Sequence, residues 1–452
     1  MTISSRLVLT LCLLTVALVT FGAGQTLDPS DRVAVLKAYN EGQYKEAHDA
    51  LRVRALELEE NRFRVDDLRL TADCLRRLNR IAELDSFLEA AVDAHGDDWR
   101  TLWATAELYR SARKYGHIVA GEFQRGRHRG RAQRVHTAQR DRARALQLYL
   151  QAESAALSVE VPNADLALFY LGWAGALKSS EAWRLQILSD LGELPDYTEG
   201  WYYERQQSAP VDADGNPIYY RAPESWETAA NDGERWRWTL ARAAFLDPNR
   251  TDSVRFTLGD FFLSQFGVQS MAHYGISQDP EDESGPFAVH TLEDHETVAK
   301  LANGVRRFDL PDEFNPLKIF RSIRDQGTDS NTQGMAADRV ASIYENRRQY
   351  PKAADAWRLA MEFGKNDYRA QRLDSIVGNW GGFLGTAKNI AGQPIEFEYR
   401  FRNATEVEFT VYEVKIDKLL ADVKAYLEKG PERVHWQKIN LSNLGYRLVQ
   451  QN

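Results

Sequence analysis

The chain has 452 residues, of which 43% are hydrophobic and 27% are charged, a composition typical of a folded protein rather than a disordered one. This length exceeds what a single compact core usually holds, so several domains or a repeat architecture are expected. The net charge of -8 at pH 7 argues against a general affinity for nucleic acid.

The first 24 residues have the pattern of a secretory signal peptide. One cation, Arg6, precedes an apolar run over residues 7–21, and the small residues 22–24 follow as a cleavage site. The run is short for a membrane span, so we favour cleavage over the alternative, an uncleaved anchor. We therefore expect residues 1–24 to be removed and the protein to be exported, to the periplasm or the cell exterior. Membrane contact is expected only through this signal.

Helical hairpins are predicted through most of residues 25–377. In residues 335–364 (MAADRVASIYENRRQYPKAADAWRLAMEFG) two helices present apolar faces to each other. These faces consist of Val340, Ala341, Tyr344, Ala353, Trp357 and Ala360. The arrangement resembles a tetratricopeptide repeat, a helix–turn–helix unit of 34 residues that buries its apolar face only by stacking on neighbours.

Earlier segments support a repeat. A first hairpin is predicted over residues 31–58, with its turn at Glu41 and Gly42. The next two units align at a separation of 34, pairing Leu68 with Leu102, Ala72 with Ala106, Leu75 with Tyr109, and Ile81 with Tyr115. Further helices are expected over residues 163–191, 226–245, 251–266, 313–334 and 365–377, and a helix that runs into a loop over residues 287–311.

Eight arginines lie close together after Tyr115, and they are Arg125, Arg127, Arg129, Arg131, Arg134, Arg140, Arg142 and Arg144. One interpretation is a contact with an anionic ligand or with nucleic acid. The other is an exposed loop between repeats, followed by a helix with a solvated basic face. We favour the second, because the run lacks interleaved aromatic residues and export separates the protein from the nucleic acid of the cell.

Residues 195–223 are predicted to form a long irregular insert with four prolines and a DGNP turn. Inserts of this length are usually functional or contact a partner. Its aromatic residues are therefore the candidate partner-binding residues, Trp201, Tyr202, Tyr203, Tyr219 and Tyr220. Together with the concave face of a helical solenoid, they would form the surface that binds a protein.

The helical pattern stops near Gly378, and residues 383–452 are predicted to be a small α+β segment. Residues 394–401 and 407–414 alternate apolar and polar side chains around a turn, which indicates a β-hairpin. A helix (KIDKLLADVKAYLEKG) and a strand-like GYRLV follow. The predicted fold class is therefore mainly α, a tetratricopeptide-like α-solenoid followed by a small and incomplete sheet-containing α+β segment.

Several long stretches resemble bacterial alpha-2-macroglobulin-like proteins. They include YGHIVAGEFQRGRHRG, APVDADGNPIYY, NDGERWRWTLA, ENRRQYPKAADAW, DSIVGNWG and FRNATEVEF, and the resemblance extends to Asn452. It implies an exported helical-repeat region that precedes macroglobulin-type β-sandwich domains, with residues 383–452 as the start of one. It also implies a system that entraps proteases, often through a thioester formed by a Cys-x-Glu-Gln motif.

The thioester motif is absent from this chain. Cys74 is followed by Leu75, Arg76 and Arg77, and the other cysteine, Cys12, lies in the signal peptide. Cys74 occupies a helical core position, so we interpret it as a small buried hydrophobe. The sequence predicts an exported interaction module, the N-terminal part of a protease-inhibitor system, with proteases or envelope proteins as partners. The alternative is a free-standing envelope repeat adaptor without inhibitor activity.

No catalytic or cofactor motif stands out. His290 and His295 form the densest histidine cluster, but a spacing of five residues does not place both imidazoles on one helical face. The GxSxG, HExxH, CxxC, Walker and dinucleotide-binding motifs are absent. We therefore expect a protein without enzymatic activity, cofactor or metal.

Overall fold

The computed structural model describes residues 27–57, 61–178, 186–200, 208–267, 288–384, 392–394, 396–410 and 415–428. The predicted signal peptide, residues 1–24, lies outside these ranges. Within them the chain is mainly helical, as the sequence predicts, and it also contains small antiparallel sheets. It divides into a first unit, residues 1–369, and a second unit, residues 370–452.

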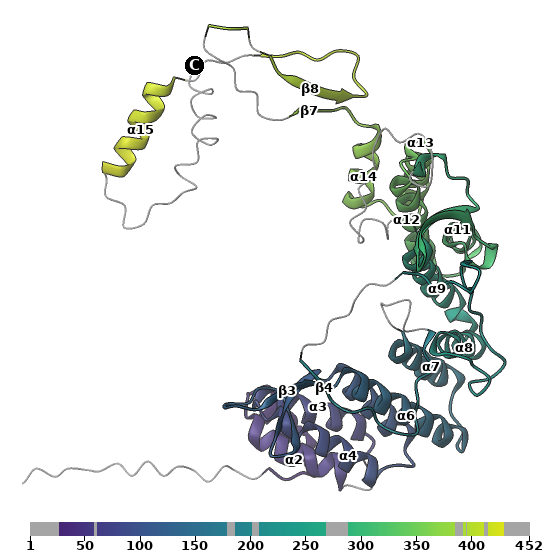
Figure 1. The fold of residues 1–452 in the computed structure, drawn as a ribbon. Coiled ribbons are helices and arrows are strands. Elements are labelled where there is room, and N and C mark those ends of the chain that lie inside the picture. The colour runs from purple at the N-terminus through teal and green to yellow at the C-terminus, as the bar shows by residue number, and fades with distance from the viewer. Residues whose placement is uncertain are drawn as a thin grey trace, which may run out of the picture. The chain divides into compact units, whose positions relative to one another are not determined.

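Helices that are neighbours in the sequence pack side by side in the first unit (Figure 1). Their bounds are α1 (Arg32–Asn40), α2 (Tyr44–Leu56), α3 (Arg64–Arg77), α4 (Leu84–Ala94), α5 (Trp99–Ser111), α6 (Ala138–Leu157), α7 (Asn163–Leu177), α8 (Asp232–Leu246), α9 (Thr251–Phe266), α11 (Pro316–Gln326), α12 (Ser330–Asn346) and α13 (Tyr350–Glu362). Single 3₁₀ turns lie at Ile81–Glu83, Pro248–Arg250, Val289–Thr291 and Asp312–Phe314. A further helix, α14 (Asp367–Val377), spans the boundary between the units.

The hairpin predicted over residues 335–364 is present as α12 and α13. All six residues of its two apolar faces are buried. Arg348 adopts a positive φ of 56° in the turn between the helices, which lets the chain reverse within three residues. Trp357 is fully buried and its indole N–H donates to the Glu345 carboxylate over 3.2 Å, so the large ring is packed without leaving its polar atom unpaired.

The separation of 34 residues also corresponds to contacts in space. The Tyr39 hydroxyl on α1 donates to Asp73 on α3, 34 residues later, over 2.5 Å. Arg64 at the start of α3 lies 3.5 Å from Asp98, again 34 residues later. The aligned pairs on α3 and α5 are buried in one core. Residues that are 34 apart in the sequence therefore lie on alternate helices of one core here.

Residues 115–136 form most of a four-stranded antiparallel sheet with the order β2-β1-β3-β4. The strands are β1 (Tyr115–Val119), β2 (Glu122–Arg125), β3 (Gln133–His136) and β4 (Thr198–Glu199). The expectation of an exposed loop here is wrong for these strands. Ala120 and Gly121, with φ of 52° and 87°, form the two-residue turn with two positive φ values that suits a tight hairpin.

A second hairpin replaces the helix expected over residues 287–311. It consists of β5 (Glu296–Leu301) and β6 (Gly304–Asp309), paired from Glu296 with Asp309 to Leu301 with Gly304. Gly304 has a φ of 122° at the turn, a conformation that L side chains rarely adopt. β-branched residues in both strands and this glycine favour a hairpin over a helix.

The sheet of the second unit pairs different residues from those predicted. β7 (Trp380–Leu384) pairs antiparallel with β8 (Glu398–Arg402), whereas residues 407–410 form no strand. Residues 411–414 and the strand-like GYRLV lie outside the described residues. Two glycines in β7 weaken its strand pattern in the sequence. At Gly381 the Tyr399 ring lies over the backbone, in space that a Cβ would occupy. The predicted helix that follows is present as α15 (Ile416–Glu428).

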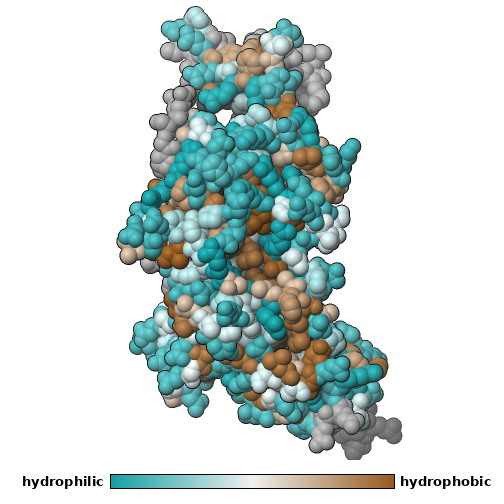
Figure 2. Space-filling view, turned by 90° about the vertical axis from the view of Figure 1, so that its right-hand side faces the viewer, coloured by the Kyte–Doolittle hydropathy of each residue, from teal (hydrophilic) through white to brown (hydrophobic). Residues whose placement is uncertain are grey.

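Within the described part of the chain, no helix combines the length and the apolar character needed to cross a membrane. On the face drawn in Figure 2, hydrophobic residues gather in separate patches between hydrophilic ones. Exposed apolar side chains are therefore best considered patch by patch.

Candidate functional site

The candidate partner-binding aromatic residues fall into two groups. Trp201, Tyr202 and Tyr203 lie outside the described residues. Tyr219 and Tyr220 are half-buried, and the Tyr219 ring packs against Phe266 and Phe314 with centroids 5.6 and 4.8 Å away. Burial raises the pKa of the Tyr219 hydroxyl. Tyr219 thus contributes to internal packing and is not the freely exposed ring that the sequence suggests.

Part of the insert is also tied to the rest of the first unit. The backbone N–H of Ala209 donates to the Lys300 carbonyl over 3.0 Å, and the N–H of Ala302 donates to the Ala209 carbonyl over 2.8 Å. These bonds attach the insert to the β5–β6 hairpin. The later described part of the insert, from residue 208 onward, is consequently attached to this hairpin.

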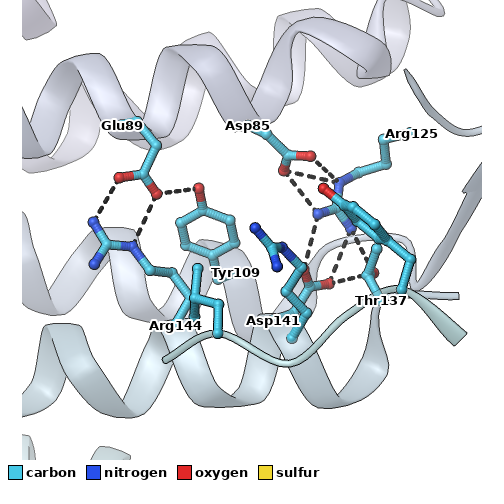
Figure 3. A pocket seen from close by; sticks show the side chains of 10 residues that line it. Asp85, Glu89, Tyr109, Arg125, Thr137, Asp141 and Arg144 are labelled. Carbon is cyan, nitrogen blue, oxygen red and sulfur yellow. Dashed lines mark hydrogen bonds and ion pairs between the residues drawn. The ribbon is translucent and has the colours of Figure 1, made fainter. Parts of the chain in front are cut away.

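Arg125, in the basic run, is buried between three elements (Figure 3). Its guanidinium donates to Asp85 on α4 at 2.7–3.3 Å and to Asp141 on α6 at 2.9 Å. It also donates to the Thr137 hydroxyl over 3.1 Å. The end of β2 is thereby fastened to two helices.

Two arginines of the basic run that lie on α6 are also paired with carboxylates. Arg144 donates to Glu89, which also accepts from the Tyr109 hydroxyl over 2.6 Å (Figure 3). Arg142 donates to Asp232, 90 residues later, over 2.7 Å. The expectation of a solvated basic face is therefore wrong for these side chains. Their partners are distant in the sequence, so the local pattern could not reveal them.

A cavity of about 250 Å³ opens beside this network. Three carboxylates and three arginines line it, and they are Asp85, Glu89, Asp141, Arg125, Arg140 and Arg144. Burial raises the pKa of Asp85 despite the opposing charge of Arg125. Burial also acts to raise the pKa of Glu89, but Arg144 and Tyr109 outweigh it and the pKa is lowered. The lining charges balance, Arg125 and Arg144 pair with the three carboxylates, and Arg140 donates to the Pro195 carbonyl, which favours a structural ion-pair network over a ligand site.

A neighbouring cavity of about 550 Å³ contains a serine and a buried aspartate. The Ser189 hydroxyl donates to Asp232 over 2.6 Å and accepts from Arg142 over 2.6 Å. No histidine belongs to the described lining of this cavity, so Ser189 has no imidazole base there to activate it. Arg142 of α6 pairs with Asp232, which lies in the first turn of α8. A negative charge at this end of a helix also stabilises the helix.

The second unit carries an exposed cluster of aromatic rings, here called the aromatic face. It consists of Phe383, Phe397, Tyr399, Phe401 and Phe409. The ring of Phe383 lies 5.0 Å from that of Tyr399, and Phe397 lies 5.1 Å from Phe409. Phe383 is nevertheless 63% exposed and Phe401 is 45% exposed. Contiguous exposed apolar side chains of this kind mark interaction surfaces.

The histidine and cysteine candidates lie apart from these surfaces. His290 is exposed, and the His295 imidazole lies 3.7 Å from Asp309. Within the described ranges, no group of three or more His, Cys, Asp or Glu side chains could hold a metal ion. Cys74 is fully buried, and burial raises the pKa of its thiol to about 11, so it is mainly protonated at neutral pH.

A scan against protein-family models finds no matching model, and a search of curated proteins finds no matching protein. Of the surfaces described above, the aromatic face is the strongest candidate for binding. Its rings are packed against each other but remain open to solvent, whereas the charged groups around Arg125 are already paired.

Proposed function

We propose that this chain is an exported protein–protein interaction module and the N-terminal part of an alpha-2-macroglobulin-like protease-inhibitor system. In this proposal the helical hairpins stack as a tetratricopeptide-like solenoid, and the second unit joins a macroglobulin-type β-sandwich. The aromatic face is the observation that carries the proposal. The resemblance of the sequence to that family supplies the identity of the β-sandwich.

The β7–β8 sheet has one side of aromatic rings, with Phe383 opposite Tyr399, and one mixed side, where Trp380 and Leu384 of β7 lie opposite Arg402 and Glu398. Along β8, Tyr399 and Phe401 alternate with Glu398, Arg400 and Arg402, so the two sets point to opposite faces. In β-sandwiches, such alternation separates an inner face that packs on a second sheet from an outer face in water. Two strands alone are at best marginally stable in water. The aromatic side therefore fits a second sheet with an apolar inner face.

Support for the helical part comes from its recurrence. Helical hairpins occur at both ends of the first unit, and a hydrogen bond between side chains 34 residues apart, Tyr39 and Asp73, links α1 to α3. Stacked hairpins of this type offer extended surfaces for proteins rather than enclosed sites for small molecules. The two cavities described above are consistent with this, since polar contacts within the chain occupy their buried charges.

The proposal is tested by site-specific photo-crosslinking in the source organism. A photo-reactive phenylalanine analogue is placed at Phe401 in the full chain with its own leader. The control position is Phe245 on α8, which is 75% exposed but belongs to the first unit. We expect Phe401 to crosslink to a macroglobulin-type β segment, in the same or another polypeptide.

A second change sharpens this test. Phe383→Ser on the aromatic face should lower the yield of the Phe401 adduct, because docking would bury the Phe383 ring, now 63% exposed, and full burial of such a side chain contributes about 1.5–3 kcal/mol. Adducts at Phe401 with unrelated envelope proteins would favour the free-standing adaptor instead. The same adducts from Phe245, or none from Phe401, would exclude the aromatic face as the docking surface.

A further inference from the structure

The loop between β2 and β3, residues 126–132, displays three arginines that differ from the rest of the basic run. Arg127, Arg129 and Arg131 are exposed, whereas Arg125 beside them is buried. These three make no ion pair with any residue in the described part of the chain. We call residues 126–132 the arginine loop.

The base of the arginine loop is fixed by several contacts. The N–H of Gly126 donates to the Tyr115 carbonyl over 2.9 Å, and the Nδ1 of His117 donates to the Gly126 carbonyl over 3.1 Å. Gly126 has a φ of 98°, and a Cβ there would lie 2.6 Å from the Ile81 side chain. Together with the buried Arg125 network, these contacts hold the loop on the sheet.

The surrounding sequence concentrates positive charge. No Asp or Glu occurs from Phe123 to Arg140, although the chain as a whole has a net charge of -8. The loop therefore concentrates positive charge, although Glu122 and Glu199 are exposed on strands of the same sheet. Its three arginines suit an anionic partner.

We propose that the arginine loop docks the protein on an anionic phospholipid surface. Guanidinium groups bind phosphate oxygens with paired, charge-assisted hydrogen bonds. Each basic residue close to an anionic membrane surface strengthens binding by about fivefold, so three give about a hundredfold. This inference goes beyond the proposed function, does not depend on it, and replaces the expectation that the protein contacts a membrane only through its signal.

Charge and composition favour a lipid surface over two other partners. Sequence-tolerant binding of single-stranded nucleic acid uses aromatic side chains that stack on bases, and residues 126–132 contain no Phe, Tyr or Trp. Tight protein interfaces centre on desolvated apolar or aromatic side chains, and Ala132 is the one apolar side chain of the loop. A phosphate-covered surface requires only accessible cations.

The test is co-sedimentation of the chain lacking residues 1–24 with vesicles. We expect binding to vesicles of phosphatidylglycerol and phosphatidylcholine, little binding to phosphatidylcholine alone, and weakening by added salt. The triple variant R127Q/R129Q/R131Q should bind about a hundredfold more weakly. The matched control, K45Q/R69Q/K365Q, removes the same charge from exposed positions elsewhere in the first unit and should retain binding.

Several results would overturn the proposal. They are unchanged binding by the loop variant, an equal loss in the control variant, and displacement from vesicles by an equivalent concentration of oligonucleotide phosphate. Inhibition by inorganic phosphate at equal concentration would mean that a free anion, not a lipid surface, is the ligand. If the triple variant unfolds at a lower temperature than the parent, R129Q alone replaces it, with an expected loss of about fivefold.

Discussion

Arg125 and Asp141 form a doubly hydrogen-bonded ion pair with two N–O distances of 2.9 Å. Their side chains are only 2% and 3% exposed, so the pair is shielded from water. Asp85 closes the other side of the guanidinium. The pair joins the end of β2 to α6. The arginine loop, residues 126–132, begins at the residue after Arg125.

Replacing Arg125 by Met should destabilise the first unit strongly. Asp141 would remain buried with only Lys114, 3.4 Å away, to balance its charge. Removing one partner of a buried pair typically costs about 3–5 kcal/mol. The free energy of unfolding in urea measures this cost. Arg127→Met, two residues later but exposed, should change it by less than about 0.5 kcal/mol, and equal losses in both variants would contradict the assigned role of Arg125.

Trp357→Ala tests the packing of the α12–α13 hairpin. The indole is fully buried, and its loss leaves a cavity between the two helices. We expect a destabilisation of about 3–5 kcal/mol in the same urea measurement. Leu359 lies on the same helix but is 41% exposed, so Leu359→Ala should cost less than about 1 kcal/mol. A small effect of Trp357→Ala would mean that this hairpin does not depend on the tryptophan.

Asp73 on α3 accepts a hydrogen bond from Tyr39 on α1, and its ionisation should make the free energy of unfolding depend on pH in the acid range. Burial acts to raise its pKa, but hydrogen bonds from Tyr39, Arg77 and Arg76 outweigh this and lower the pKa to about 2 from 3.8. A depressed pKa stabilises the folded state above pH 3.8, and this stabilisation is lost as the pH falls through about 2.

Asp73→Asn should therefore cost about 1–2 kcal/mol near neutral pH, after allowance for partial solvent screening. The difference from the parent should shrink between about pH 4 and pH 2 when unfolding is followed across this range. Asp93→Asn removes an exposed carboxylate on α4 and serves as the control. A difference that stays constant with pH would show that Asp73 does not contribute through its charge.

Local patterns in the sequence were enough to predict many of the helices, although not to exclude a helix over residues 287–311. The hairpin around Trp357, the turn at Glu41 and Gly42, and the match of Leu68 with Leu102 depend on periodicity within a few turns, and the structure contains all three. Such signals lie within one element or repeat. They do not depend on which distant segments meet.

The strands and the charged network could not be predicted in this way. Arg125 pairs with Asp85 and Asp141, which are 40 and 16 residues away in the sequence. Because these partners are distant, the local pattern predicted a solvated run of arginines, although Arg125 is buried. The β7 strand contains Gly381, which weakens a strand pattern unless the Tyr399 ring above it is known. A clearer local signal was the turn at Ala120 and Gly121, which separates two alternating segments.

Cys74 offers the last test, because it reports on burial of the α3 core. Burial raises the pKa of its thiol to about 11 from 9.0, with Asp73 adding to the shift. The reactive species is the thiolate, so iodoacetamide at about pH 8 should alkylate the folded chain far more slowly than the urea-unfolded one.

A raised pKa also has a defined effect on stability. The folded state retains the thiol proton of Cys74 to a higher pH than the unfolded state does. The contribution of Cys74 to the free energy of unfolding is therefore complete below pH 9 and is lost as the pH rises through about 11. The stability difference between the parent and Cys74→Ala should therefore narrow across that window. Rapid alkylation of the folded chain, at a rate close to that in urea, would mean that the α3 core opens readily and that Cys74 is not held within it.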